Sequence, residues 1–359
     1  MSKKVLIAMS GGIDSSIAAI LLKEKGYNLV GVTFRTWDYI SDNCMSKKTG
    51  CCDIESLMEA KSFAESLGFE HHILDLRETF KNTVIKYFID EYLNGKTPNP
   101  CIVCNSFIKW GELRKFADSH NCEYIATGHY ATIKNNGNRY YLAKGVDKLK
   151  DQSYFLWNLT TELLEKTLFP LGKYTKEEIR KMAEKFGLKK LVEKRESQEI
   201  CFIPDNDYRK FLIENVPGIE EKLSGGNFID KNYNILGNHK GYPFYTIGQR
   251  KGLKIAVGHP LYVTKIFPHK NLVMLGEKEE LLSNSMMIKD YNLNKYAELP
   301  ENKEFEIKIR YRSEPVPAKI IKEKEHLSVK FLKDVSAITP GQSAVIYEGD
   351  DLVGGGIIC

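Results

Sequence analysis

Residues 10–15 spell SGGIDS, a glycine- and serine-rich segment between an apolar run and an amphipathic run. The apolar run at 3–9 is typical of a buried parallel strand. The run at 16–26 has helical periodicity and ends in Gly26, which favours a helix C-terminus there. A loop between a strand and a helix points backbone N–H groups and the positive end of the helix dipole at a phosphate. We therefore predict a phosphate-binding turn of an α/β sheet, with an ordinary glycine-rich turn as the alternative.

Strand-like and helix-like runs alternate through residues 1–204, which is typical of a doubly wound parallel α/β sheet. Residues 205–278 are rich in glycine, asparagine and aromatic residues and are expected to form a small central domain. Strand-like runs separated by turns at 279–359 predict a C-terminal antiparallel β-barrel. Within the first domain, we predict strands at 27–34 and 69–76, a strand that leads into a loop at 123–131, and helices at 53–68 and 173–188.

The composition is that of an ordinary globular protein, with 42% hydrophobic and 28% charged residues. The net charge of +5 allows an RNA partner without requiring one, because a lysine-rich solvated surface gives the same value. The apolar stretch before Ser10 is too short for a signal peptide, and no run approaches the ~20 apolar residues of a membrane span. We therefore expect a cytoplasmic protein with no membrane partner. Its eight cysteines are then reduced, and a functional pair is catalytic or metal-binding.

Cys101 and Cys104 form a C-x-x-C pair that follows a Pro-Asn-Pro turn and precedes an amphipathic run. Such a pair can hold zinc, ligate an iron–sulfur cluster, exchange a disulfide or attack a substrate. A helix that starts just after Cys104 would activate its thiol, because the helix N-terminus stabilises a thiolate. The pair alone does not choose among these chemistries.

A series of motifs along the whole chain resembles one family, the tRNA-specific 2-thiouridylases. The motifs stand in the order of that family: AMSGGIDSS, TPNPCIVCN, IATGHYA, KDQSYFL, ESQEICFI, GQRKGL, RYRS and TPGQSAV. The first is neither a Walker A loop nor a G-x-G-x-x-G turn, and it resembles the PP-loop of ATP pyrophosphatases. The resemblance implies an adenine nucleotide alpha hydrolase-like domain that uses ATP and Mg²⁺ and acts on tRNA.

The resemblance also implies two sets of binding residues. The ATP site would comprise Ala8, Met9, Ser10, Gly11, Gly12, Ile13, Asp14, Ser15, Phe34 and Gly128. The tRNA contacts would be Asn99, Pro100, Cys101, His129, Lys150, Asp151, Gln152, Arg310, Tyr311 and Gln342. Without the resemblance, His129 is a hydrogen-bonded core histidine and residues 150–152 are a polar turn.

By the same resemblance, Cys201 carries sulfur as a persulfide, and Cys104 lies near the activated base and can close a disulfide with Cys201. Cys101 departs from the pattern, because many members have an aspartate there. A thiol with a pKa of about 8.5 is a poor replacement for a carboxylate with a pKa of about 4 in handling a proton. Cys101 therefore does different chemistry or acts as a ligand. Cys101, Cys104 and Cys201 as three ligands of a [4Fe-4S] cluster, persulfide chemistry without metal, and a zinc knuckle all remain open.

The other cysteines give weaker signals. Cys44, Cys51 and Cys52 are interpreted as incidental thiols of a surface loop, with a redox or metal role as the alternative. Cys122 is expected in the core, and Cys359 is assigned no role.

Residues 239–254, HKGYPFYTIGQRKGLK, contain Lys240, Arg250, Lys251 and Lys254, three aromatic residues and no acidic residue. Cations neutralise phosphates and aromatic rings stack on bases, so the pattern favours RNA binding. A basic turn over a small aromatic core explains it equally well.

The sequence thus predicts a tRNA-uridine 2-sulfurtransferase that adenylates the 2-oxygen of the wobble uridine and replaces it with sulfur. The sulfur donor would be a persulfide-carrying protein or sulfide. Two alternatives are a PP-loop ligase or amidotransferase that acts on a small carbonyl substrate, and a non-catalytic tRNA-binding protein with a structural metal.

Overall fold

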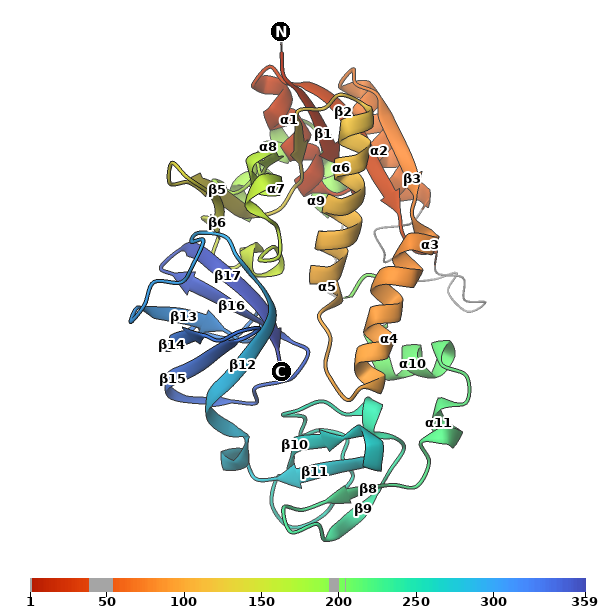
Figure 1. The fold of residues 1–359 in the computed structure, drawn as a ribbon. Coiled ribbons are helices and arrows are strands. Elements are labelled where there is room, and N and C mark those ends of the chain that lie inside the picture. Colours follow the sequence, from red (N-terminus) through yellow and green to blue (C-terminus); the bar gives the residue numbers. More distant parts are fainter. Residues whose placement is uncertain (1, 39–53, 194–199, 204) are drawn as a thin grey trace.

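The computed structural model describes residues 2–38, 54–193, 200–203 and 205–359, so Cys44, Cys51 and Cys52 lie outside the described residues. Figure 1 shows an α/β unit (red to green), a small unit with β-strands (cyan) and a β-barrel (blue). None of the described helices is long and apolar enough to cross a membrane.

Strand β1 (Lys4–Ala8) is the central strand of a parallel sheet with the order β3–β2–β1–β4–β7. Val5, Leu6 and Ile7 are fully buried, which explains why the run is apolar on both faces. The order reverses at β1, which confirms the predicted doubly wound sheet. The other strands are β2 (Asn28–Arg35), β3 (His71–Asp75), β4 (Tyr124–Ala126) and β7 (Thr167–Leu168).

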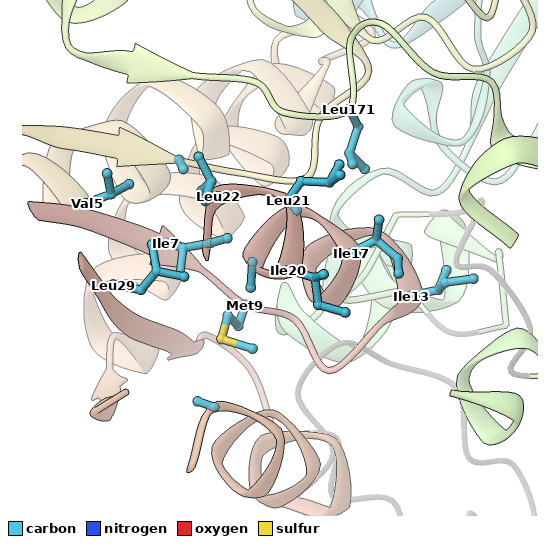
Figure 2. Close-up of a cluster of buried hydrophobic side chains, with 14 of the residues drawn as sticks. Val5, Ile7, Met9, Ile13, Ile17, Ile20, Leu21, Leu22, Leu29 and Leu171 are labelled. Carbon is cyan, nitrogen blue, oxygen red and sulfur yellow. The ribbon is translucent and has the colours of Figure 1, made fainter. Parts of the chain in front are cut away.

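Helices cover both faces of this sheet. On one face, Ile17 and Leu21 of α1 pack with Val5 and Ile7 of β1 (Figure 2). On the other, Leu113 of α6 packs in a cluster that includes Cys122, so the prediction of a core position for that cysteine is confirmed. The helices are α1 (Ile13–Glu24), α2 (Ile54–Ser66), α8 (Lys176–Lys185), α9 (Lys189–Glu193) and α6 (Gly111–Ser119).

Two long helical segments extend from this unit toward the cyan unit (Figure 1). The first consists of α3 (Arg77–Phe80), the π-helical η1 (Lys81–Ile85) and α4 (Lys86–Leu93). The second consists of α5 (Pro100–Val103), the π-helical η2 (Cys104–Trp110) and α6. The prediction that a helix starts after Cys104 is wrong. The helix begins at Pro100, because proline has the right φ and lacks an N–H that would go unbonded at the first helical position.

The central unit is a β-sheet preceded by two short helices. Its strand order is β10–β11–β8–β9. Tyr242 and Phe244 of the basic segment are buried against this unit and α4, so the structure favours the aromatic-core interpretation over base stacking. The elements are α10 (Tyr208–Asn215), α11 (Ile219–Lys222), β8 (Gly226–Ile229), β9 (Ile235–His239), η4 (Tyr242–Phe244), β10 (Tyr262–Phe267), η5 (Pro268–Lys270) and β11 (Leu272–Gly276).

The C-terminal strands close into an antiparallel barrel, as predicted. The order β12–β15–β14–β13–β16–β17 is closed by pairing of β12 with β17, where Ile288 faces Ile358. The elements are η6 (Lys278–Leu281), β12 (Leu282–Leu293), β13 (Glu304–Lys308), β14 (Val316–Lys322), β15 (Leu327–Ser336), β16 (Ser343–Glu348) and β17 (Asp351–Ile358).

The barrel and the α/β unit share a core. The hairpin of β5 (Ala131–Asn135) and β6 (Tyr140–Lys144) joins the barrel sheet, where Ala143 pairs with Asp351. The following segment, with η3 (Ser153–Phe155) and α7 (Thr161–Glu165), inserts Trp157, whose indole N–H donates to Ser343 Oγ at 3.2 Å. One buried cluster contains Ile102, Trp110 and Tyr154 together with Val345 and Tyr347 of the barrel.

A network of charged side chains reinforces this junction. Lys295 Nζ lies 2.7 Å from Glu348 Oε2 and 2.6 Å from Asp351 Oδ2, and Lys134 of the hairpin lies 2.6 Å from Asp351 Oδ1. Burial alone would raise the pKa of Glu348, but hydrogen bonds from Lys295, Lys303 and Tyr296 outweigh it and lower the pKa to about 2. The carboxylate thus favours the folded state as long as it is ionised.

Glu348→Gln is expected to lower the free energy of unfolding by about 2 kcal/mol at pH 7, after a discount for partial exposure. A lowered pKa stabilises the fold above the ordinary value of 4.5, and this contribution is lost as the pH falls toward about 2. The difference between wild type and variant should therefore shrink below pH 4.5 in urea titrations. Glu325→Gln, on an exposed turn, is the control. A difference independent of pH would contradict the charge-based explanation.

Candidate functional site

The loop between β1 and α1 has the geometry of a phosphate cradle. Gly12 is the N-cap of α1 and has no side chain to accept hydrogen bonds from the first N–H groups of the helix. Ser15 Oγ accepts a hydrogen bond from Ser10 N at 3.2 Å and donates to Gly12 O at 3.1 Å, which fixes the loop. These N–H groups and the helix dipole favour an anion at this point.

Gly11 allows the loop to pass under α2. Its φ is +68°, and a Cβ there would lie 2.5 Å from the carbonyl oxygen of Ser56. Gly128, after the end of β4, approaches the same loop from the other side, and a Cβ there would lie 3.0 Å from Ser15 N. Only glycine fits either position without moving the loop.

Gly11→Ala should weaken binding of a non-hydrolysable ATP analogue by at least 10-fold, because a clash with the Ser56 carbonyl adds to a backbone strain of about 1 kcal/mol. Calorimetric titration gives the dissociation constant. Gly26→Ala is the matched control, since Gly26 has a φ of +81° but no heavy atom within 4 Å of the added Cβ. Equal affinities for the two variants would show that the loop does not bind the nucleotide.

Asp14, in the first turn of α1, is held by two residues that the sequence did not reveal. Lys176 Nζ lies 2.8 Å from each carboxylate oxygen, and the Tyr130 hydroxyl donates to Oδ1 at 2.6 Å. Lys176 is 6% exposed and begins α8. A buried lysine beside a phosphate cradle is suited to neutralise an anion there.

The remaining residues predicted for ATP lie around this loop. Phe34 is near the end of β2, the strand next to β1, and is partly buried. Met9 and Ile13 are buried on either side of the loop, and Met9 N donates to Val32 O at 2.8 Å. Ala8 ends β1.

His129 is buried and hydrogen-bonded on both ring nitrogens. Nδ1 lies 2.7 Å from Thr127 Oγ1, and Nε2 lies 3.4 Å from Lys109 Nζ. Burial, with a smaller effect of Lys109, holds the pKa of His129 well below its usual value, so the ring is neutral at pH 7. These contacts favour the core-histidine alternative for the side chain.

The cysteine pair lies on the first turns of the helix that begins at Pro100. Cys101 and Cys104 are one turn apart and share a face. Cys104 is half-buried against the cluster that also contains Ile200 and Phe202, the neighbours of Cys201. One hydrophobic cluster thus joins the helix of Cys104 to the segment of Cys201, although the two are far apart in the sequence.

Cys101 differs from Cys104 in its surroundings. Its side chain is exposed to solvent, whereas that of Cys104 is half-buried. Desolvation by the surrounding protein raises the pKa of the Cys101 thiol, although Lys109 opposes the rise. The thiol is therefore protonated at neutral pH and does not replace the charge of a carboxylate.

The three thiols do not form a metal site in this structure. Within the described ranges, no three His, Cys, Asp or Glu side chains lie close enough together to hold one metal ion. A three-thiolate cluster at Cys101, Cys104 and Cys201 and a zinc knuckle therefore both lack a ligand set among these residues.

The loop before the cysteines is held by the barrel. Gln342 Nε2 donates to Thr97 O at 2.9 Å and to Pro98 O at 3.1 Å, and Thr97 N donates to Pro340 O at 2.9 Å. Asn99 and Pro100 follow directly, as N-cap and first residue of α5.

The other residues predicted to contact tRNA have internal partners. Asp151 is buried and accepts hydrogen bonds from Gly145 N and from Ser153 N and Oγ. Gln152 Oε1 accepts from Tyr130 N at 3.0 Å, and Lys150 beside it is half-buried. Tyr311 packs on Phe155 with ring centroids 4.5 Å apart.

Three family models match consecutive parts of the chain. The tRNA methyl transferase HUP domain matches residues 3–205, a PRC-barrel domain matches 215–277, and an aminomethyltransferase beta-barrel domain matches 283–358. The tRNA-specific 2-thiouridylase MnmA of Amoebophilus asiaticus is 52% identical over 99% of this chain and 95% of its own. The chain belongs to the MnmA family. Two other members are similar to this chain over its full length. MnmA of Cytophaga hutchinsonii is 49% identical over 100% of this chain and 98% of its own. MnmA of Salinibacter ruber is 50% identical over 100% of this chain and 95% of its own.

Among solved structures, a 4-thiouridine synthetase–RNA complex with bound ATP covers 60% of this chain and 51% of its own at 19% identity, with a TM-score of 0.37. Membership of the MnmA family rests on the sequence matches along the full chain.

Proposed function

We propose that this chain is an ATP-dependent tRNA-uridine 2-sulfurtransferase that converts the wobble uridine to 2-thiouridine. The relatives named tRNA-specific 2-thiouridylase MnmA share about half of its residues over their full length. The observation that supports the proposal is that Cys104, on a helix that continues to the sheet bearing the phosphate loop, packs against the same hydrophobic cluster as Ile200 and Phe202, the neighbours of Cys201. ATP chemistry and reduced thiols together suit the cytoplasm.

The first step is adenylation of the uridine. The 2-oxygen attacks the α-phosphorus of ATP, the bond to the β-phosphate breaks, and pyrophosphate leaves. Residues 10–15 and Lys176 would hold the departing phosphates through N–H groups and positive charge. Mg²⁺ would neutralise further phosphate charge, and Asp14 offers the oxygen ligand that this ion prefers. Phe34 and Gly128 would line the adenosine.

The second step replaces oxygen with sulfur. A persulfide on Cys201 attacks C2 of the uridine through its outer sulfur, and AMP leaves. The Cys104 thiolate then attacks Cys201 Sγ, which breaks the S–S bond, releases 2-thiouridine and leaves a Cys104–Cys201 disulfide for an external thiol to reduce. A persulfide-carrying protein or sulfide with an oxidant would recharge Cys201. This route needs no metal.

For the tRNA, the target base would leave its stack and approach the surface formed by Asn99, Pro100 and Cys101. His129, Lys150, Asp151 and Gln152 would act mainly by shaping this surface, because the side chains of His129, Asp151 and Gln152 have internal hydrogen bonds. Arg310, Tyr311 and Gln342 would contact tRNA from the barrel. The proposal assigns residues 1–204 to the catalytic domain, 205–278 to the central domain and 279–359 to the barrel domain.

Mass spectrometry of nucleosides tests the proposal. Anaerobically purified protein is incubated with ATP, Mg²⁺, unthiolated tRNA and a persulfide donor, and iron and acid-labile sulfide are measured on the same preparation. We expect 2-thiouridine together with stoichiometric AMP. AMP without any thiolated nucleoside would favour a PP-loop ligase or amidotransferase. Binding of tRNA without AMP release would favour a non-catalytic RNA-binding protein. Thiolation that requires bound iron would replace the metal-free route.

A further inference from the structure

A cavity of about 490 Å³ lies where the α/β unit, the central unit and the barrel meet. The α/β unit contributes Thr97, the start of α10 contributes Arg209, the central unit contributes Gln249 and Lys251, and the barrel contributes Arg310 and Gln342. The walls fit closely: Gly248 has a φ of +85°, and a Cβ there would lie 3.0 Å from Ala337 Cβ. The cavity is thus a product of the assembled fold.

The lining of this cavity has positive charge and no acidic residue. Arg310 Nη2 donates to Ala337 O at 2.7 Å and Thr339 Oγ1 at 2.8 Å, and Arg209 Nε donates to Phe244 O at 2.8 Å. These acceptors are neutral, and among the described residues Arg209, Lys251 and Arg310 form no salt bridge. Burial lowers the pKa of Arg310, as expected for a cation without a nearby carboxylate.

The positive charge continues outside the cavity. Arg250 and Lys254, on either side of Lys251, are exposed. A linear polyanion could contact both the cations of the cavity and the exposed Arg250 and Lys254, whereas a single small anion could contact only the cations of the cavity. An RNA strand carries one phosphate per nucleotide and has this form.

We propose that the cavity binds a backbone phosphate of the tRNA, with Arg209, Lys251 and Gln249 as contacts beside Arg310 and Gln342. This inference rests on the proposed function for the identity of the RNA. Gln342 also holds the loop at Thr97 that leads to the cysteines, so a phosphate seated here is linked directly to the site of chemistry. The cavity would set the register in which the anticodon arm reaches Cys104.

Filter binding of unthiolated tRNA at 50–200 mM salt tests the proposal with Arg209→Gln, Lys251→Gln and the double variant. Each single variant should bind about 10-fold more weakly and lower the slope of log affinity against log salt by about 0.7–1, as loss of one phosphate contact requires. Lys265→Gln, an exposed cation on β10 of the same unit, is the matched control and should bind as wild type does. Wild-type affinity and slope in the double variant would overturn the proposal.

Two further measurements distinguish binding of tRNA from binding of a product anion and from failure of the proposed function. Binding of ATP and of inorganic pyrophosphate without tRNA should be unchanged in both variants, which also checks that they fold. A selective loss of pyrophosphate binding would mean that the cavity holds a product anion, and would overturn the RNA assignment. If wild type binds tRNA yet forms no 2-thiouridine, the proposed function fails while the binding data still decide the role of the cavity.

Discussion

Cys201→Ser is expected to abolish 2-thiouridine formation, by a factor of at least about 10³, while adenylation of the tRNA continues. Serine cannot carry a persulfide, so no sulfur reaches C2, but the phosphate loop and its lysine are untouched. Single-turnover assays that record pyrophosphate and 2-thiouridine from the same reaction separate the two steps. Pyrophosphate should appear at a rate close to that of wild type.

Cys104→Ser should also prevent release of the product, because no thiolate remains to break the S–S bond to Cys201. Cys359→Ser, which removes another exposed thiol, is the control and should behave as wild type does. Thiolation by Cys201→Ser at the wild-type rate would show that sulfur reaches the uridine by another route. Loss of bound iron in Cys101→Ser, together with loss of activity, would point to a cluster instead.

Lys176→Met is expected to lower kcat/KM for pyrophosphate release by at least 100-fold, a loss of about 2.7 kcal/mol in the transition state. The lysine is the buried cation next to the loop, and it holds both oxygens of Asp14. Its removal takes away charge that the departing pyrophosphate needs and releases the Asp14 carboxylate from its position. The effect falls on the first step, whereas the effect of Cys201→Ser falls on the second.

Lys181→Met is the matched control for Lys176→Met, because it lies on the same helix but is exposed. Thermal unfolding of both variants shows how much of the effect is structural, since loss of one partner of a buried ion pair destabilises a fold. Adding Asp14→Asn to Lys176→Met restores charge balance and should recover stability without recovering activity. Full activity in the single variant would assign Lys176 a purely structural role.

Local patterns were enough to predict most of the fold. The apolar run at β1, the glycine loop and the helical period of α1 depend on neighbours within a few residues, and the structure has them as predicted. The alternating runs after residue 279 likewise predicted the barrel. The start of the cysteine helix was missed, because a Pro-Asn-Pro segment favours a turn as much as a helix N-terminus.

The parts of the site that could not be predicted depend on contacts between distant segments. Thr175 and Glu178 form a capping box that marks the start of α8 in the sequence, but nothing local shows that Lys176 meets Asp14, 162 residues earlier. The aromatic residues of the basic segment were ambiguous for the same reason. Their burial depends on α4, which is far away in the sequence.

The barrel residue Gln342 donates hydrogen bonds to the loop at Thr97 and Pro98 that leads to Cys101 and Cys104, and this residue is synthesised late. Gln342 emerges from the ribosome 245 residues after Thr97, which takes about 10–50 s at 5–20 residues per second. Once Leu168 has emerged, the nascent chain contains the whole nucleotide-binding sheet, while the loop that leads to Cys104 still lacks its final hydrogen bonds. Nucleotide binding should therefore mature before sulfur transfer does, and a chain stalled before residue 340 would hold ATP without a finished site for the base.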